Sequence, residues 1–316
     1  TKVLYYDCTN YYFEIEEESG SKRYGKSKEN RPNPIVTMGL FMDTDGIPLA
    51  FDIFPGNQNE QTTLKPLEAK VMQDFGCSEF IFCSDSGLGS KKNRLFNSFG
   101  NRSYVITHSL KKMKEEDRNI ALNPKQYRHL GSEKFVDLNT LDETDEDVFN
   151  SIYYKEIPMV TGKLDETLIV TYSPKYKAYR QIERAEKMIA SPDKKRKGKN
   201  TNDPARFIKK TSVTTDGEIA EKCIYRLDQD KIDNESRYDG FYAVITNLDC
   251  NVKEIIRINQ QRWEIEENFR IMKTEFEARP VYVQRDDRIK AHFLTCYLSL
   301  LLYRLVREET RRGIYL

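Results

Sequence analysis

Histidine and tryptophan are scarce in this sequence, and its cysteines are scattered. The 316 residues include 3 histidines, 1 tryptophan and 6 cysteines, and no two cysteines form a CxxC pair. A zinc site needs clustered ligands, and Ser–His or Cys–His catalysis needs a histidine beside the nucleophile, so we exclude both kinds of site. Scattered cysteines predict free thiols in a reducing compartment, the cytoplasm. Carboxylates must therefore carry any chemistry.

Long apolar runs and a richness in glycine or proline are also lacking. With 15 glycines and 11 prolines, collagen-like and low-complexity chains are excluded. The most apolar stretch, Phe293 to Val306, is too short for the roughly 30 Å of a bilayer core, so we expect a buried helix there and no membrane partner. The chain opens without Met, directly in a strand-like run, and we expect it to be a piece of a longer protein.

What the sequence does have is an ordered series of short elements within its first 110 residues. Apolar, β-prone runs come first, and the later runs alternate with helical patterns. Between two of the early runs, Asp43-Thr44-Asp45-Gly46 is a hairpin signal. The predicted strands are 3–6 continued by 11–15, 35–42, 47–54, 80–83 and 103–107, and the predicted helices are 60–75 and 91–99. Three antiparallel strands followed by parallel strands with helical crossovers predict an α/β fold, with a ribonuclease H-like mixed sheet flanked by helices.

The middle of the chain has a different pattern. Strands are predicted at 152–157, 167–172 and 221–227, a helix at 176–189 and a basic linker at Lys194 to Lys199. Between Ser173 and Thr211, thirteen Lys and Arg residues stand against four Asp and Glu, although the net charge of the whole chain is only +1. This basic segment is either a solvated loop or a surface that contacts phosphates.

The last third returns to an α/β pattern. A strand is predicted at 240–246, then a long helix at 252–276 capped by Asn251, and a second helix at 285–311. We therefore predict three segments: a catalytic core at 1–110, a β-rich insertion subdomain at 111–238, and the second part of the core at 239–316.

Three carboxylates stand out by their positions. Asp7 ends the predicted first strand and Asp85 ends the predicted fourth strand, its parallel neighbour in a ribonuclease H-like sheet. Side chains at the carboxyl ends of parallel neighbours face one crevice, where open α/β sheets bind their ligands. Glu266 lies on the long helix that would pack against this edge. Taken singly, Asp7 could equally be a strand-end cap and Asp85 a turn former.

The helix that carries Glu266 places it between two bases. Arg262, Glu266 and Lys273 are spaced by four and by seven residues, so they share one stripe about 60° wide. Surface helices commonly carry such pairs at i and i+4, each worth a few tenths of a kcal/mol. On spacing alone the stripe is either a solvated face or part of a site.

Several segments together resemble the DDE transposases of bacterial insertion sequences. The helix Arg262-Trp263-Glu264-Ile265-Glu266 through Lys273 resembles the R-x3-E-x6-K part of their Y-x2-R-x3-E-x6-K signature. Leu4-Tyr5-Tyr6-Asp7-Cys8-Thr9 and Phe82-Cys83-Ser84-Asp85-Ser86-Gly87 match in the same order, as do Gly46-Ile47-Pro48-Leu49 and Pro55-Gly56-Asn57 with Glu60. The likeness covers most of the first 110 residues and about 240–305. The tyrosine of the signature is replaced by Asn259, which can bond a phosphate or base but cannot stack on it.

The resemblance implies a function and a site. Asp7, Asp85 and Glu266 would bind two Mg²⁺ or Mn²⁺ ions, which prefer carboxylate oxygens and suit in-line phosphoryl transfer. Arg262 and Lys273 would hold flanking phosphates of double-stranded DNA. Further candidate DNA contacts are Asn259, Trp263, which either stacks on an unpaired base or packs against the sheet, and the basic residues Lys194, Lys195, Arg196 and Lys197.

The resemblance predicts the catalytic domain of a transposase, which cleaves DNA at transposon ends and transfers the strand into target DNA. We expect it to act in the bacterial cytoplasm as a homodimer on DNA. We also expect this chain to lack the N-terminal DNA-end recognition domain of the family, and therefore to have weak sequence specificity. Two alternatives remain: a metal-dependent nuclease of the same fold without strand transfer, and a non-catalytic DNA-binding remnant, for which Asn259 is the one support in the sequence.

Overall fold

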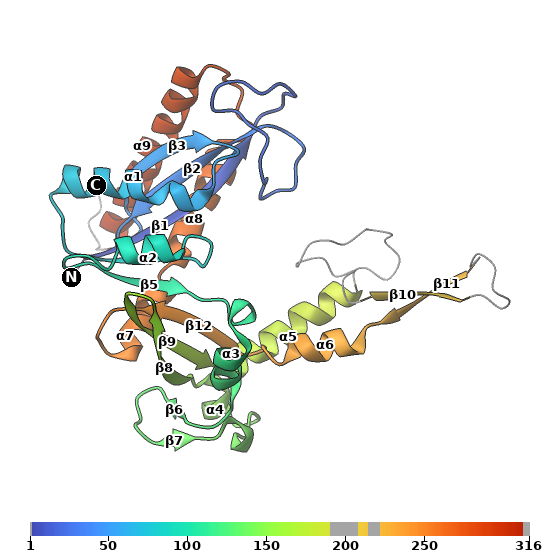
Figure 1. Ribbon diagram of the computed structural model, residues 1–316. Coiled ribbons are helices and arrows are strands. Elements are labelled where there is room, and N and C mark those ends of the chain that lie inside the picture. Colours follow the sequence, from blue (N-terminus) through green and yellow to red (C-terminus); the bar gives the residue numbers. More distant parts are fainter. Residues whose placement is uncertain (1, 190–207, 214–221, 312–316) are drawn as a thin grey trace. The chain divides into compact units, whose positions relative to one another are not determined.

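The computed structural model describes residues 2–189, 208–213 and 222–311 of the chain (Figure 1). The chain divides into two units, and each is described by itself. The first unit comprises Thr1–His108, Pro158–Ile169 and Val244–Leu316, and the second comprises Ser109–Ile157 and Val170–Ala243. The three predicted segments, 1–110, 111–238 and 239–316, have other boundaries and stay a prediction.

The first unit is built on a mixed β-sheet. In the order β3-β2-β1-β4-β5-β12, its strands are β3 (Pro48–Pro55), β2 (Ile35–Met42), β1 (Lys2–Tyr12), β4 (Phe80–Ser84), β5 (Ser103–Thr107) and β12 (Phe241–Thr246). Strands β1, β2 and β3 pair antiparallel, β4 pairs parallel with β1, and β5 pairs parallel with β4. This is the strand order of a ribonuclease H-like core, so the predicted fold class is confirmed.

The hairpin between β2 and β3 forms where the sequence predicts it. The Asp43 Oδ1 atom accepts hydrogen bonds from the backbone N–H groups of Asp45 and Ile47, both at 2.9 Å. Gly46 has a φ of +77°, a conformation that costs glycine little and other residues more. Every residue of β2 is buried, which explains why Thr37 is the one polar side chain in this strand and why polar and apolar residues do not alternate along it.

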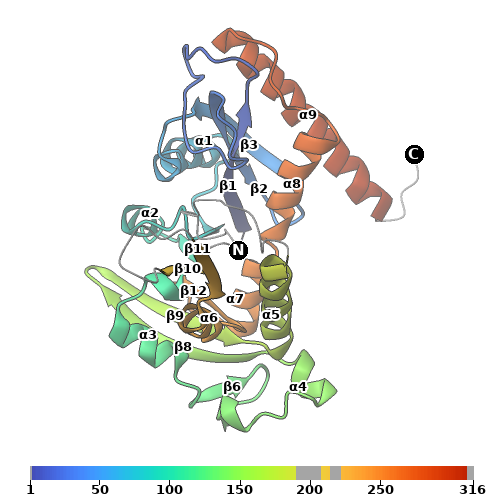
Figure 2. The same ribbon diagram turned by 90° about the vertical axis from the view of Figure 1, so that its right-hand side faces the viewer.

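Helices cover both faces of this sheet. The 3₁₀ turn η1 and helix α1 follow β3, α2 follows β4, and α7, α8 and α9 follow β12. Figure 2 shows α1 on one side of β1, β2 and β3, and α8 and α9 on the other. Their bounds are η1 Glu60–Thr62, α1 Leu64–Phe75, α2 Lys91–Phe96, α7 Val252–Gln260, α8 Trp263–Thr274 and α9 Asp286–Arg311.

The prediction of one continuous helix at 252–276 was wrong, because the chain forms α7 and α8 with a break between them. Asn251 caps α7 as predicted, its side chain accepting from the N–H of Lys253 at 2.8 Å. At the break, the backbone N–H groups of Arg262 and Glu264 donate to carbonyls three residues earlier, at 3.3 and 3.1 Å. These tighter bonds of 3₁₀ type interrupt the α-helical ladder, so Arg262 becomes the N-cap of α8.

Helix α9 is longer than the apolar stretch predicted within it. It has 26 residues, and by length and composition alone it could cross a membrane, with 28% of its most apolar window buried. The length of α9 therefore does not exclude a span, and the expectation of no membrane partner stays a prediction. Ile289, Phe293, Cys296 and Leu300 form the buried face, while Leu298 and other large apolar residues of the helix are exposed.

The second unit mixes short helices and strands. Its first stretch begins at Ser109 and ends within β8 (Tyr153–Thr161), and its second stretch begins within β9 (Leu164–Tyr172) and ends within β12. These three strands therefore contribute residues to both units. Strands β10 (Ile208–Val213) and β11 (Lys222–Leu227) pair antiparallel along their whole length. The other elements of this unit are η2 Leu110–Lys112, α3 Glu115–Leu122, β6 Tyr127–His129, β7 Phe135–Val136, η3 Leu138–Thr140, α4 Glu146–Asn150, α5 Pro174–Ile189 and α6 Gln229–Ser236.

Candidate active site

The sheet register of the first unit brings Asp7 and Asp85 to corresponding positions. Strands β1 and β4 run parallel from Lys2 with Phe80 to Tyr5 with Cys83, and the same register continued by two residues matches Asp7 with Asp85. The prediction that Asp7 ends β1 was wrong, because β1 continues to Tyr12 beside β2. Asp7 is instead the residue of β1 that lies just beyond the end of β4. The side of β1 that β4 no longer covers is the crevice expected at the carboxyl end of a parallel strand.

Asp7 lies in an environment that favours its protonated form. Burial raises the pKa of its carboxyl to about 6, the positive charge of Lys28 lowers it, and the negative charge of Asp85 raises it. The backbone N–H of Cys8, which donates to Asp7 Oδ1 at 2.7 Å, and the charge of Arg262 also favour the carboxylate. Two acids that act on each other in this way form a like-charge pair, which a bound cation would relieve.

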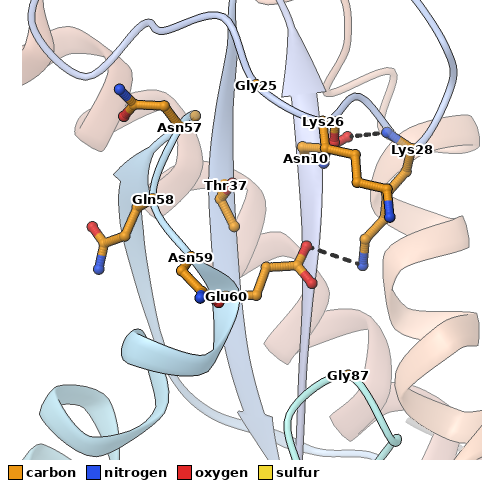
Figure 3. Close-up of a pocket in the computed structure, with 11 residues that line it drawn as sticks. Asn10, Gly25, Lys26, Lys28, Thr37, Asn57, Gln58, Asn59, Glu60 and Gly87 are labelled. Atoms are coloured by element: carbon orange, nitrogen blue, oxygen red, sulfur yellow. Dashed lines mark hydrogen bonds and ion pairs between the residues drawn. The ribbon is translucent and has the colours of Figure 1, made fainter. Parts of the chain in front are cut away.

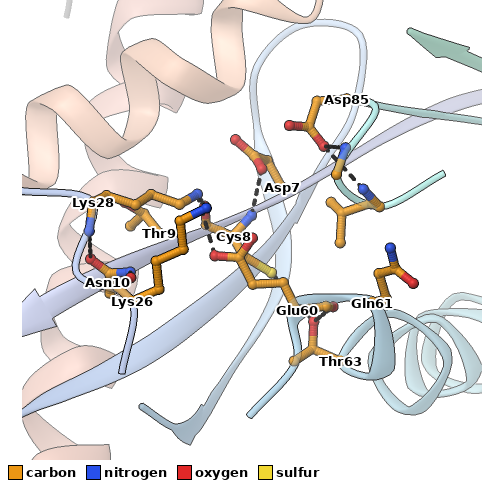
Figure 4. A network of polar contacts seen from close by, with 12 residues as sticks. Asp7, Cys8, Thr9, Asn10, Lys26, Lys28, Glu60, Gln61, Thr63 and Asp85 are labelled. Carbon is orange, nitrogen blue, oxygen red and sulfur yellow. Dashed lines mark hydrogen bonds and ion pairs between the residues drawn. The ribbon is translucent and has the colours of Figure 1, made fainter. Parts of the chain in front are cut away.

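Asp85 is held by the turn that follows β4. Its Oδ1 atom accepts hydrogen bonds from the backbone N–H groups of Gly87 at 2.9 Å and Leu88 at 3.2 Å (Figure 4). A Cβ atom at Gly87 would lie 3.2 Å from the same oxygen, so the absence of a side chain leaves room for the carboxylate. The carboxylate of Asp85 is thus fixed by backbone donors on one oxygen, in the manner of an Asx turn.

Glu266 is paired with a base. Its carboxylate lies 2.9 Å from Arg262 Nη1, one turn earlier, and its side chain is 58% exposed. Among the residues that the structure describes, no three His, Cys, Asp or Glu side chains are grouped closely enough to hold a metal ion. The structure therefore brings Asp7 and Asp85 under each other's influence, while Glu266 is tied to Arg262. Arg262 acts on both parts of the site, because it pairs with Glu266 and its charge also lowers the pKa of Asp7.

Lys273, in the last turn of α8, lies close to β1. Its ammonium group donates to Thr9 Oγ1 at 2.7 Å and lies 3.6 Å from Glu29 Oε1. Its pKa is lowered to about 8, chiefly by burial and also by the positive charge of Lys28, against the opposing effect of Asp7. A partly buried ammonium group beside a second cation is a favourable position for an anionic ligand.

The loop between β1 and β2 contributes residues that the sequence analysis missed. Lys28 donates to the carbonyl oxygen of Cys8, lies 3.5 Å from Glu60 Oε1 and acts electrostatically on Asp7 and Asp85. Figure 4 shows its side chain extended along β1 toward these carboxylates. The only signal was a pair of lysines two residues apart in a polar loop, and nothing in the sequence shows that this loop folds back over β1.

The other predicted DNA contacts have different surroundings. Asn259, near the end of α7, is buried, and its Oδ1 atom accepts a hydrogen bond from Thr107 at 3.3 Å. Trp263 is 53% exposed at the first position of α8, so it does not pack into the core of the sheet. The basic residues Lys194, Lys195, Arg196 and Lys197 lie outside the described residues.

Three comparisons place these observations among known proteins. None of the curated proteins matches the chain. Among solved structures, it is similar to the structure titled "Cryo-EM structure of piggyBac transposase synaptic complex with hairpin DNA", with 9% sequence identity and a TM-score of 0.49, over 99% of this chain and 48% of that one. The chain thus spans about half the length of that protein. The family model described as "Transposase DDE domain" matches residues 13–302, and the chain therefore belongs to the transposase DDE domain family.

Proposed function

We propose that this chain is the catalytic domain of a transposase that cuts DNA strands at transposon ends and joins them to target DNA. The observation that carries the proposal is the pairing of Asp7 and Asp85 at the open side of β1 in a ribonuclease H-like sheet. Membership of the transposase DDE domain family supports it. The substrate would be double-stranded DNA in the bacterial cytoplasm, bound by two copies of the chain.

The residues present fit divalent metal ions in part. Asp7 and Asp85 offer the hard oxygen donors that Mg²⁺ and Mn²⁺ prefer. Burial, together with the negative charge of Asp85, raises the pKa of Asp7, so a bound cation would stabilise its carboxylate. Glu266 would join them as a third ligand once its carboxylate exchanges Arg262 for a metal ion. When bound, two such ions would supply Lewis acidity that activates the attacking water or 3′-hydroxyl and stabilises the leaving oxygen.

The remaining residues of the chain would bind and orient the DNA strand. Arg262 presents a guanidinium fork suited to a phosphate, and Lys273 presents a single ammonium group. Hydrolysis would break a P–O3′ bond at the transposon end and leave a 3′-hydroxyl. That hydroxyl would then attack a phosphodiester of target DNA, forming a new P–O bond as the target 3′-oxygen leaves. Asp7 must be ionised to take part, which its pKa of about 6 permits at neutral pH.

Nicking of supercoiled plasmid in Mg²⁺ or Mn²⁺ tests the proposal. The unaltered chain should nick the plasmid, and Asp85→Asn should lose this activity. Asp52→Asn is the matched control, because Asp52 is exposed on β3 and should leave nicking unchanged. Equal metal-dependent nicking by the chain and by Asp85→Asn would refute the assigned site.

A second assay separates the proposed function from its alternatives. An oligonucleotide with a precut 3′-hydroxyl end is incubated with the chain, metal ions and target plasmid. Joined product supports the transposase, whereas nicking without joining favours a nuclease of the same fold. DNA binding without either reaction favours the non-catalytic remnant, for which the pairing of Glu266 with Arg262 is the structural support.

A further inference from the structure

A pocket of about 450 Å³ adjoins the acid pair within the first unit (Figure 3). It lies between two loops, one joining β1 to β2 and the other joining β3 to η1. Its lining includes Asn10, Lys26, Lys28, Thr37, Glu60 and Gly87. Gly87 donates its N–H to Asp85, and Lys28 acts on both acids, so a ligand in this pocket would be a direct neighbour of the candidate active site.

Close backbone packing shapes the pocket. A Cβ atom at Gly25 would overlap the carbonyl oxygen of Gly56, and one at Gly56 would overlap two other backbone carbonyl oxygens. The N–H of Gly56 also donates to the carbonyl of Ser21 at 3.2 Å. The two loops are thus in contact through glycines at one end of the pocket.

A buried amide positions the two lysines. Asn10, on β1, is 4% exposed, and its side chain bonds the loop in both directions. Its Nδ2 group donates to the carbonyl of Lys26 at 3.2 Å, and its Oδ1 atom accepts from the N–H of Lys28 at 3.0 Å. The backbone on either side of Ser27 is therefore fixed to β1, so both lysines extend from an anchored segment.

The charges of the pocket favour an anion. Glu60 is its one carboxylate, and it lies 3.5 Å from Lys28. Among the described residues, no carboxylate forms an ion pair with Lys26. The positive charge of Lys28 also acts on Lys273, so cations from two sides approach the same region beside Asp7.

We propose that Lys26 and Lys28, anchored by Asn10, form a binding subsite for a backbone phosphate of the DNA strand that passes the acid pair. The strand would continue from the acids into the pocket, between the two loops. The ligand is a phosphodiester and not a base, so the subsite acts independently of sequence. This inference rests on the proposed function, because it takes DNA as the substrate.

The salt dependence of DNA binding tests the subsite without any cleavage. Binding of the chain to a short duplex of arbitrary sequence is measured in EDTA between about 50 and 200 mM salt. Lys26→Gln should reduce the slope of log K against log salt by about 0.9, the release of one phosphate counterion, and weaken binding about fivefold or more at 0.1 M salt. Lys26→Arg, which keeps the charge, should restore the slope.

Lys70→Gln is the matched control, since Lys70 is exposed on α1 and does not line the pocket. Asn10→Ala should resemble Lys26→Gln, provided that its thermal unfolding shows a folded protein. The subsite is refuted if Lys26→Gln leaves the slope unchanged, or if Lys70→Gln reduces it as much. Because the measurement is made in EDTA, this failure is distinct from a failure of the proposed function, which would appear as nicking that survives Asp85→Asn.

Discussion

Replacing Asp7 by Asn should stabilise the metal-free protein at neutral pH. Burial and the charge of Asp85 raise the pKa of Asp7 from 3.8 to about 6. A carboxyl group that binds its proton more tightly in the folded state stabilises the fold below pH 3.8, and this contribution is lost as the pH rises through 6. Each tenfold change in proton affinity corresponds to 1.36 kcal/mol, so the loss amounts to about 3 kcal/mol at full effect.

The measurement is urea unfolding in EDTA between about pH 4 and pH 8, followed by the fluorescence of Trp263, the one tryptophan of the chain. Asp7→Asn should be about 1 to 3 kcal/mol more stable than the unaltered chain at pH 7.5, the lower value allowing for partial hydration. The difference should disappear toward pH 4. An asparagine at position 7 can still accept the hydrogen bond from Cys8, so this contact is not a source of the difference.

Asp52→Asn is the matched control for this experiment. The Asp52 carboxylate accepts the N–H of Ile53 at 2.8 Å, as Asp7 accepts that of Cys8, but on an exposed residue. Its replacement should change the free energy of unfolding by no more than about 0.5 kcal/mol. A loss of stability in Asp7→Asn, or a difference that does not vary with pH, would show that the fold does not disfavour the ionised carboxylate of Asp7.

Three further changes have defined outcomes. Lys28→Gln removes a positive charge that lowers the pKa of Asp7, so the acid limb of the pH profile of plasmid nicking should move to higher pH; an unmoved limb would contradict the coupling. Gly56→Ala would place a methyl group against two backbone carbonyl oxygens and should lower the free energy of unfolding in urea by about 1 to 3 kcal/mol. An unchanged free energy of unfolding would show that the loop adjusts freely to the methyl group. Arg304→Met would remove the guanidinium that now lies 2.7 Å from the carboxylate of Glu264. This change should lower the free energy of unfolding by about 3 to 5 kcal/mol. An unchanged free energy of unfolding would show that the ion pair adds nothing to stability.

The ribonuclease H-like core could be predicted because its elements are short and punctuated by strong local signals. Strands 35–42 and 103–107 have the predicted bounds, and the hairpin signal at Asp43 to Gly46 forms the turn between β2 and β3. The break between α7 and α8 could not be predicted, because the residues around 261 carry neither proline nor glycine. It depends on local 3₁₀ bonding, accompanied by the bond from the Tyr5 hydroxyl to the carbonyl of Ile258 at 3.0 Å, which joins residues distant in sequence.

The candidate site was predictable only where strand order determines proximity. Asp7 and Asp85 each lie two residues beyond the last paired residues of β1 and β4, Tyr5 with Cys83, and the element order implies that these parallel strands are neighbours. The ion pair of Glu266 with Arg262 follows equally from their spacing of four on a helix, although spacing cannot tell whether that pairing or a metal ion takes the carboxylate. Lys28 escaped prediction because its place depends on the course of a long loop, which Asn10 holds through the backbone.

Binding of Mn²⁺ to the chain, followed by electron paramagnetic resonance, is the sharpest test of a metal site at Asp7 and Asp85. We expect saturable binding by the unaltered chain at millimolar metal. Asp7→Asn and Asp85→Asn should abolish this binding and Glu266→Gln should weaken it, while Asp52→Asn should bind normally. Mn²⁺ binding that is absent from the unaltered chain, or that is unchanged in Asp7→Asn and Asp85→Asn, would contradict the assignment of these carboxylates to a metal-dependent active site.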